Sequence, residues 1–180
     1  MIAYFLVLLA VLSRYLVAGH LPLLNFTAVT GGLIYFGAKR SWREMIGPLA
    51  ILMVSDYCLT TYTYHYAFHW QGYIPTWIWY VAAMALGQIL LRAKTSVVRV
   101  AAGAILGPTA FFVISNYAVW LGSVFYPHTM SGLMTCYAAA IPFYGNDLAA
   151  TSIVLAAAFG VPVLAKKLNP AEPATVRVKK

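Results

Sequence analysis

Long runs of apolar residues constrain this chain more than any other feature of its sequence. Each run continues for roughly twenty residues before polar or turn-forming residues interrupt it, which is the length that a helix needs to cross a ~30 Å hydrocarbon layer. Since 62% of the residues are hydrophobic and 9% are charged, too few polar side chains remain to cover a soluble surface. We therefore expect an all-α fold, a polytopic membrane bundle.

The breaks between the runs predict six transmembrane helices, near residues 2–19, 26–38, 45–63, 74–92, 98–122 and 146–165. The second is short, so it must tilt or begin inside the protein. The first is not expected to be a removable signal peptide, because no basic residue precedes its apolar run and Arg14 interrupts it. Residues 1–167 would form a single transmembrane domain. Residues 168–180, with two prolines and three basic residues, would form a short cytoplasmic tail.

The positive charges predict the orientation. They follow the second span (Lys39, Arg40, Arg43), separate the fourth from the fifth (Arg92, Lys94, Arg99) and close the sixth (Lys166, Lys167). The opposite connections, near 20–25, 64–73 and 123–145, contain no Lys or Arg. Because basic loops stay in the cytoplasm, both termini should be cytoplasmic. The net charge of +8 then reflects topology, and the expected partner is the lipid bilayer rather than a nucleic acid.

Two similar stretches of eleven residues occur in the chain, "GPLAILMVSDY" at 47–57 and "GPTAFFVISNY" at 107–117. Upstream, "FGAKRS" at 36–41 and "LRAKTS" at 91–96 also share a pattern. We interpret this as a parallel helical-hairpin repeat, with spans 2–3 equivalent to spans 4–5, in which Asp56 and Asn116 take corresponding positions. Parallel repeats in transporters relate two halves that bind substrate where they meet.

Polar residues gather on the predicted outer side. All four histidines fall there, and Asp56, Asn116, Asn146 and Asp147 lie at or near outer helix ends. Arg14 is the one basic residue inside a span and away from its cytoplasmic end. An ionisable group within a span costs at least ~2.5–3.5 kcal/mol, so Arg14 should face the interior and pair with Asp56 or Asp147.

Aromatic residues crowd the same side, above all in "YTYHYAFHWQGY" at 62–73, which we expect to roof a pocket for a planar, partly polar small molecule. Interfacial aromatic belts are the alternative role for many of these rings. The candidate substrate-binding residues are Arg14, His20, Asn25, Asp56, Tyr57, His69, Asn116, Tyr117, Asn146 and Asp147. Asn25 is also placed to cap the second span, as is Thr27.

Other chemistry is sparse. His65 and His69 have a spacing that would put both on one face of a helix, and with His128 and Cys136 they are the candidate ligands of an outward metal site. Cys58 and Cys136 could form a disulfide or serve as small apolar residues. The chain lacks HExxH, GxSxG, P-loop, GxGxxG and CxxC motifs, so no resident cofactor and no catalytic residue are predicted.

Several segments resemble a family. "LPLLNFTAVTGGLIYFG", "MVSDY", "ISNYAVW" and "YPHTMSGLMTCYAAAIPFYGNDL" look like the motifs of an uncharacterised family of small bacterial inner-membrane proteins. That family is similar in plan to the S-components of energy-coupling-factor vitamin transporters, including the solitary vitamin B12 transporters. The resemblance implies an inner-membrane location, a possible coupling subunit and a cobalamin as a possible transported ligand. His20, His69 and Cys58 would be its candidate cobalt ligands.

Three functions follow from these features. The first is an S-component-like membrane transporter, or substrate-binding subunit, that takes up a small nutrient from the outer side. The second is a membrane scaffold or accessory subunit that does not transport. The third is a metal-dependent membrane enzyme. Transport predicts a ligand-sized cavity with Asp56 and Asn116 on its wall, a scaffold predicts a flat exposed patch, and an enzyme predicts histidines that converge on a metal.

Overall fold

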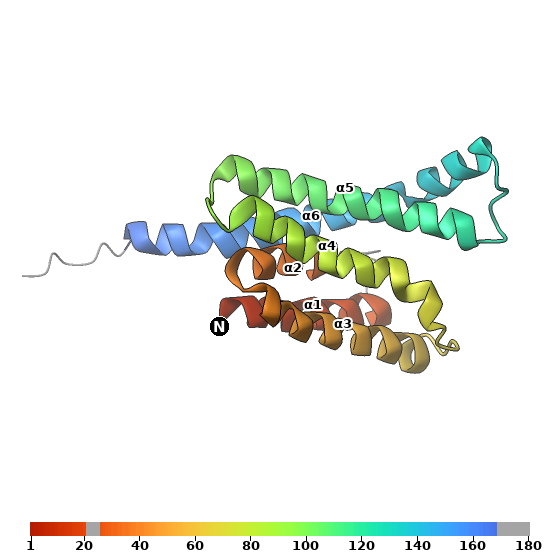
Figure 1. Cartoon of the computed structure of the whole chain (residues 1–180), viewed down its shortest axis with the longest axis horizontal. Helices are drawn as coiled ribbons and strands as arrows, with labels where there is room; N and C mark the ends of the chain where they lie inside the picture. Colours follow the sequence, from red (N-terminus) through yellow and green to blue (C-terminus); the bar gives the residue numbers. More distant parts are fainter. Residues whose placement is uncertain (21–25, 169–180) are drawn as a thin grey trace, which may run out of the picture.

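The computed structural model describes residues 1–20 and 26–168, and these residues form six α-helices and no strand. The helices are α1 (Ile2–His20), α2 (Val29–Lys39), α3 (Ile46–Cys58), α4 (Ile74–Leu91), α5 (Val97–Gly122) and α6 (Met130–Leu168). A 3-10 turn, η1 (Trp42–Met45), precedes α3, a π-helical turn, η2 (Leu59–Thr63), extends it, and a second 3-10 turn, η3 (Trp70–Tyr73), leads into α4. The all-α prediction is confirmed (Figure 1).

Four helical segments of the described chain are long and apolar enough to cross a membrane: Trp42–Thr63, Trp70–Leu91, Val97–Gly122 and Met130–Ala165. Ile2–Ala18 is a shorter apolar helix, and α2 has only 11 residues, which span about 16 Å at 1.5 Å per residue. The helices therefore fit a membrane protein, while the arrangement as six spans stays a prediction.

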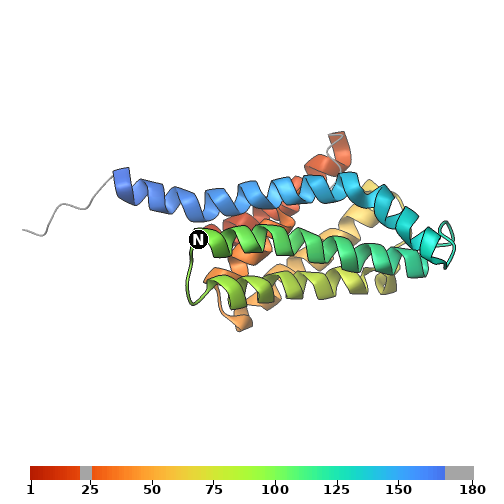
Figure 2. The same ribbon diagram turned by 90° about the horizontal axis from the view of Figure 1, so that it is seen from above.

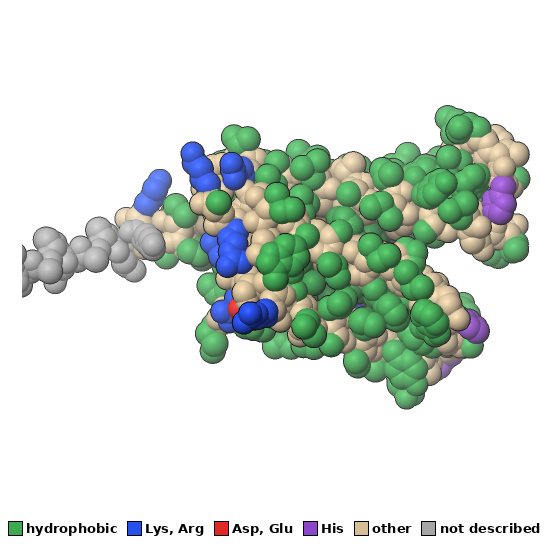
Figure 3. Space-filling model, viewed as in Figure 1, with side chains coloured by type: hydrophobic (Ala, Val, Ile, Leu, Met, Phe, Trp, Pro, Cys, Tyr) green, Lys and Arg blue, Asp and Glu red, His purple; other side chains and the backbone are tan. Residues whose placement is uncertain are grey.

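The two ends of the bundle differ in charge. Lys and Arg side chains gather at the end that carries the α2–α3 and α4–α5 connections, which we call the cationic end (Figures 1 and 3). Histidines lie at the opposite end, which carries the α3–α4 and α5–α6 connections and which we call the histidine end. Apolar side chains cover the flanks between them (Figure 3). The separation of charge predicted from the loops is therefore present in the fold.

The short helix α2 lies at the centre of the bundle, where it packs against α1, α4, α5 and α6. Its glycines permit this, because they carry no side chain on the faces of α2 that meet the neighbouring helices. A Cβ on Gly31 would lie 2.8 Å from the Cβ of Val154 on α6, and a Cβ on Gly32 would lie 3.1 Å from the carbonyl oxygen of Leu6 on α1. Small residues let helix backbones approach closely in membranes. The glycine content of α2 therefore explains how eleven residues contact so many helices.

The closest approach joins α2 to α4. A Cβ on Gly37 would lie 1.8 Å from the carbonyl oxygen of Met84, and a Cβ on Gly87 would lie 1.9 Å from that of Ile34. Each helix thus presents a glycine to the backbone of the other. On α5, a Cβ on Gly107 would lie 2.7 Å from the side chain of Ile34, so this glycine likewise permits close packing of α5 against α2.

The boundaries predicted for the last helix are wrong. Residues 130–145 were expected in an outer connection, but α6 begins at Met130 and continues to Leu168. Pro142 lies inside this helix, which bends along its length (Figure 2), because a proline inside a membrane helix kinks it rather than ending it when neighbours satisfy the freed carbonyl. As a consequence Asn146 and Asp147 lie in the middle of a helix and not at its end.

The suggested repeat stays a prediction. Helices α3 and α5 run in the same direction, as a parallel repeat requires (Figure 1). The two similar stretches lie at different distances from the start of their helices, however. Helix α3 starts at Ile46, directly before Gly47, whereas α5 starts at Val97, ten residues before Gly107.

Candidate functional site

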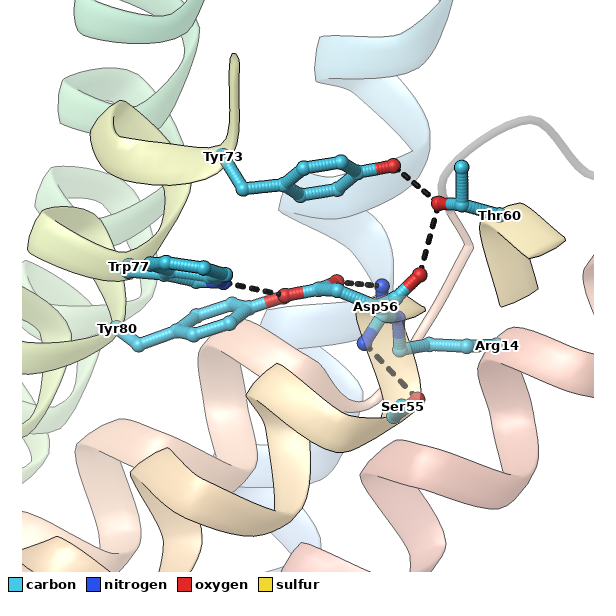
Figure 4. Close-up of polar contacts among 7 residues, drawn as sticks. All are labelled: Arg14, Ser55, Asp56, Thr60, Tyr73, Trp77 and Tyr80. Atoms are coloured by element: carbon cyan, nitrogen blue, oxygen red, sulfur yellow. Dashed lines mark hydrogen bonds and ion pairs between the residues drawn. The ribbon is translucent and has the colours of Figure 1, made fainter. Parts of the chain in front are cut away.

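Arg14 forms the predicted ion pair with Asp56. Its guanidinium donates to Asp56 Oδ1 and, at 3.1 Å, to the hydroxyl of Ser55 (Figure 4). The side chain of Asp56 is 1% exposed and that of Arg14 17% exposed, so the pair is held inside the bundle between α1 and α3. A charge taken from water into this interior requires such a partner. The prediction that Arg14 pairs with Asp56 or Asp147 is therefore confirmed for Asp56.

Two residues that the sequence did not single out complete the shell of Asp56. Trp77 Nε1 donates to Asp56 Oδ2 at 2.9 Å, and the Tyr80 hydroxyl donates to Oδ1 at 3.2 Å. Both reach across from α4, and Arg14 reaches from the other side (Figure 4). With three side-chain donors, the Asp56 carboxylate is well satisfied by the protein itself. It therefore has little capacity left for a ligand.

Aromatic rings from the segment 62–73 lie next to this pair. Phe68 stacks on Tyr73 with ring centroids 5.0 Å apart, and Tyr73 stacks on Trp77 at 6.2 Å. Tyr57 packs edge-on against Phe68. The Tyr73 hydroxyl is hydrogen-bonded to Thr60, which donates to the backbone oxygen of Asp56 at 2.8 Å. The segment thus continues the contacts around Asp56, and its role as a roof over a ligand stays a prediction.

A second buried carboxylate, Asp147, lies on α6 against the beginning of α2. Thr30 donates to its Oδ2 at 3.3 Å and Thr151 to its Oδ1 at 3.2 Å. Thr151 follows Asp147 by four residues, which places both on one face of the helix. Asp147 is 5% exposed. Neither of the two ion pairs found in residues 1–20 and 26–168, Arg14–Asp56 and Arg40–Glu44, includes it.

Asp147 lies on the wall of two hollows. One, of about 140 Å³, is also lined by Arg14, Thr30, Tyr80 and Phe111. The other, of about 270 Å³, lies between α5 and α6. Its further lining residues are Pro108, Phe111, Phe112, Ser115, Asn116, Val119, Tyr126, Cys136, Ala139, Ala140, Phe143 and Tyr144. Phe111 and Asp147 are common to both hollows, so the buried carboxylate connects the Arg14 region with an aromatic-lined space.

The remaining candidate binding residues are distributed less closely. Asn116 lines the larger hollow and donates to the Phe112 carbonyl at 2.7 Å. Tyr57 and Tyr117 are 43% and 47% exposed and contact other rings.

His69 is exposed beside η3. His20 ends α1, Asn146 precedes Asp147 within α6, and Asn25 lies outside the described residues. Thr27 does not cap α2; the amide of Ala28 instead donates to Ser13.

The candidate metal ligands do not converge in the described part of the chain. His65 and His69 were expected on one helix face, but the segment between η2 and η3 is not helical, and His65 has a positive φ of 57°. His128, in the α5–α6 connection and not in the segment of His65 and His69, is exposed and hydrogen-bonded to the backbone carbonyl oxygen of Trp120. Cys58 and Cys136 are free thiols. No group of three or more His, Cys, Asp or Glu able to hold a metal occurs among the described residues.

A separate groove of about 680 Å³ lies between α5 and α6 nearer the cationic end, and its polar lining residues are Thr95, Ser96, Ser152 and Lys167. Its other lining residues are mostly aliphatic. Binding pockets combine an apolar wall with a few converging polar groups that fix the orientation of the ligand. No acidic or amide side chain is among the residues that line this groove, so the hollows at Asp147 are the better candidate site.

The model of a family of unknown function, DUF6580, matches residues 1–172, and the chain therefore belongs to that family. The family description assigns no activity. No curated protein and no solved structure matches the chain.

Proposed function

We propose that this member of DUF6580 is a membrane transporter, or the substrate-binding subunit of one, that takes up a small nutrient through the hollows beside Asp147. One observation carries the proposal: a buried carboxylate outside the ion pairs of the described chain lies on the wall of two adjoining hollows. An ionisable group inside a membrane protein is costly to bury, and such groups commonly mark pathways for substrates or ions.

The shape of the site supports a small ligand. The two hollows measure about 270 and 140 Å³, at or below the lower end of the ~300–1,000 Å³ usual for ligand pockets. A cobalamin is far larger than either, so its passage would need the helices to separate. We therefore propose a ligand of about the size of a single aromatic ring with one polar group.

The expected position of the ligand differs from that inferred from the sequence in one respect. Asn116 lies on the wall of the larger hollow and Arg14 on that of the smaller, but Asp56 is on the wall of neither. We assign Asp56 to the positioning of Arg14, Trp77 and Tyr80 around the site. Asp147 is then the acidic group that contacts the ligand.

Uptake can be tested without knowing the ligand. Cells grown to uniform ¹³C content and expressing the protein would receive an unlabelled mixture of amines, amino acids, nucleobases and vitamins. We expect at least one unlabelled compound to accumulate with the natural protein and not with Asp147→Asn at equal protein level. Identical accumulation profiles for both proteins and for cells without either would contradict uptake and favour the scaffold function.

The orientation gives a separate prediction. In a background with both cysteines replaced by Ala, a cysteine at Val124, in the α5–α6 connection, should react with a membrane-impermeant maleimide in intact spheroplasts. A cysteine at Ala93, in the α4–α5 connection, should react only after permeabilisation. The expected difference follows from the basic residues around Ala93, which hold that connection in the cytoplasm. Labelling in the reverse pattern would invert the proposed direction of binding.

A further inference from the structure

The charges around the two hollows do not balance. Of the four acidic residues in the chain, three lie in the part that the structure describes. Glu44 pairs with Arg40, at 3.3 Å, and Asp56 pairs with Arg14. Asp147 is the third, and it is held only by the hydroxyls of Thr30 and Thr151 among the partners found. Hydroxyl groups satisfy a carboxylate less well than a cation does.

Arg14 does not supply the missing positive charge. It lines the smaller hollow together with Asp147, but its guanidinium donates to Asp56 and Ser55. Since Arg14 and Asp56 cancel each other, the fixed charge that remains beside the hollows is that of Asp147. A carboxylate or phosphate ligand would bring a second negative charge to the same desolvated place, which like-charge repulsion disfavours.

The walls of the larger hollow suit a cation. Five aromatic side chains line it: Phe111, Phe112, Tyr126, Phe143 and Tyr144. The rings of Phe112 and Tyr144 are 5.0 Å apart, so they form a continuous surface. Aromatic faces attract cations, and the attraction is strongest where water is excluded. Their apolar area also accepts a flat hydrocarbon body.

We propose that the ligand is a small organic cation, with a protonated amine or amidine that pairs with Asp147 and an apolar, planar body that packs against the aromatic wall. This assignment rests on the proposed function and narrows it to a substrate class. The carboxylate oxygens keep lone pairs free beyond those used by Thr30 and Thr151, so an amidinium group could donate to both oxygens at once.

Three isosteric probes test which ligand charge the site prefers. Benzamidine is a cation, benzamide is neutral and benzoate is an anion, yet all have nearly the same size and shape. Calorimetric titration of the purified protein is expected to give at least tenfold tighter binding of benzamidine than of the other two. Asp147→Asn should remove that preference, and Ser152→Ala, an exposed change five residues further along α6, should retain it. A preference for benzamide or benzoate in the natural protein would overturn the cation assignment.

A second measurement needs no change at Asp147. Cys136 lies on the wall of the larger hollow, and with Cys58 replaced by Ala it is the only thiol left in the chain. Benzamidine should slow the reaction of Cys136 with methyl methanethiosulfonate, and benzoate should leave the rate unchanged. Equal protection by all three probes would support binding in the larger hollow but refute its selectivity for cations. No binding and no protection by any probe would contradict the cation assignment and the proposed site together.

Discussion

Replacing Gly37 by Ala is expected to prevent the protein from accumulating in folded form. The new Cβ would lie 1.8 Å from the carbonyl oxygen of Met84, a backbone atom that can move only if α2 and α4 separate. Overpacking in a tight core commonly costs ~1–3 kcal/mol, and a backbone clash lies at or above the upper end of that range. Because α2 is the central helix, the damage would extend to its contacts with α1, α5 and α6.

The measurement is the yield of monodisperse protein and its unfolding temperature in detergent. Gly87→Ala should behave in the same way, since its Cβ would lie 1.9 Å from the Ile34 carbonyl oxygen. Gly47→Ala and Gly160→Ala are matched controls, because no atom beyond the adjoining backbone of the same helix lies within 4 Å of a Cβ at either position. Both controls should be neutral or slightly stabilising, by up to ~1 kcal/mol, as alanine favours helices over glycine. Normal stability of the Gly37 and Gly87 variants would refute the α2–α4 crossing.

Replacing Asp56 by Ala is expected to lower the free energy of unfolding by about 3–5 kcal/mol, the usual cost of leaving one member of a buried ion pair alone. The change would leave the guanidinium of Arg14 without its anion and the donors Trp77 Nε1 and Tyr80 OH without their acceptor. Unfolding monitored by tryptophan fluorescence would report the loss, since Trp77 lies at the affected position.

The paired substitution Arg14→Met with Asp56→Leu separates charge from packing. Removing both charges together leaves no unpaired ion, so the part of the Asp56→Ala loss that comes from the lone Arg14 charge should return. If the double substitution is as unstable as the single one, the ion pair is not what Asp56 contributes to the fold.

Much of this fold could be predicted from the sequence, because a hydrocarbon solvent leaves few alternatives. Helical runs near twenty residues, basic loops at one end and an Arg14 that needs a buried partner all follow from the cost of polar groups in lipid. The length of α6 could not be predicted in this way. Its residues 130–145 contain serine, glycine and proline, which indicate a connection in water but are tolerated in a helix that packs against α5.

The residues of the proposed site could be singled out from the sequence in part, for a related reason. Charged residues inside spans are rare enough to identify Arg14, Asp56 and Asp147 directly. Tyrosine and tryptophan are frequent at membrane interfaces, so nothing distinguished Trp77 and Tyr80 from ordinary interfacial rings. Their three-residue spacing on α4 could have indicated a shared face, but not that this face meets Asp56. Likewise Gly37 and Gly87 do not reveal their partners until the helices are assembled.

Native mass spectrometry of the protein released from the membranes of its own cells tests the central claim most directly. The account predicts that the natural protein retains a small molecule, that its mass fits a compound with a basic nitrogen, and that Asp147→Asn, purified at equal yield, retains much less. Asp147→Asn keeps an oxygen that can accept from Thr30 or Thr151, so it should remain folded. Equal retention by the two proteins, or no retained molecule in either, would contradict a binding site at Asp147.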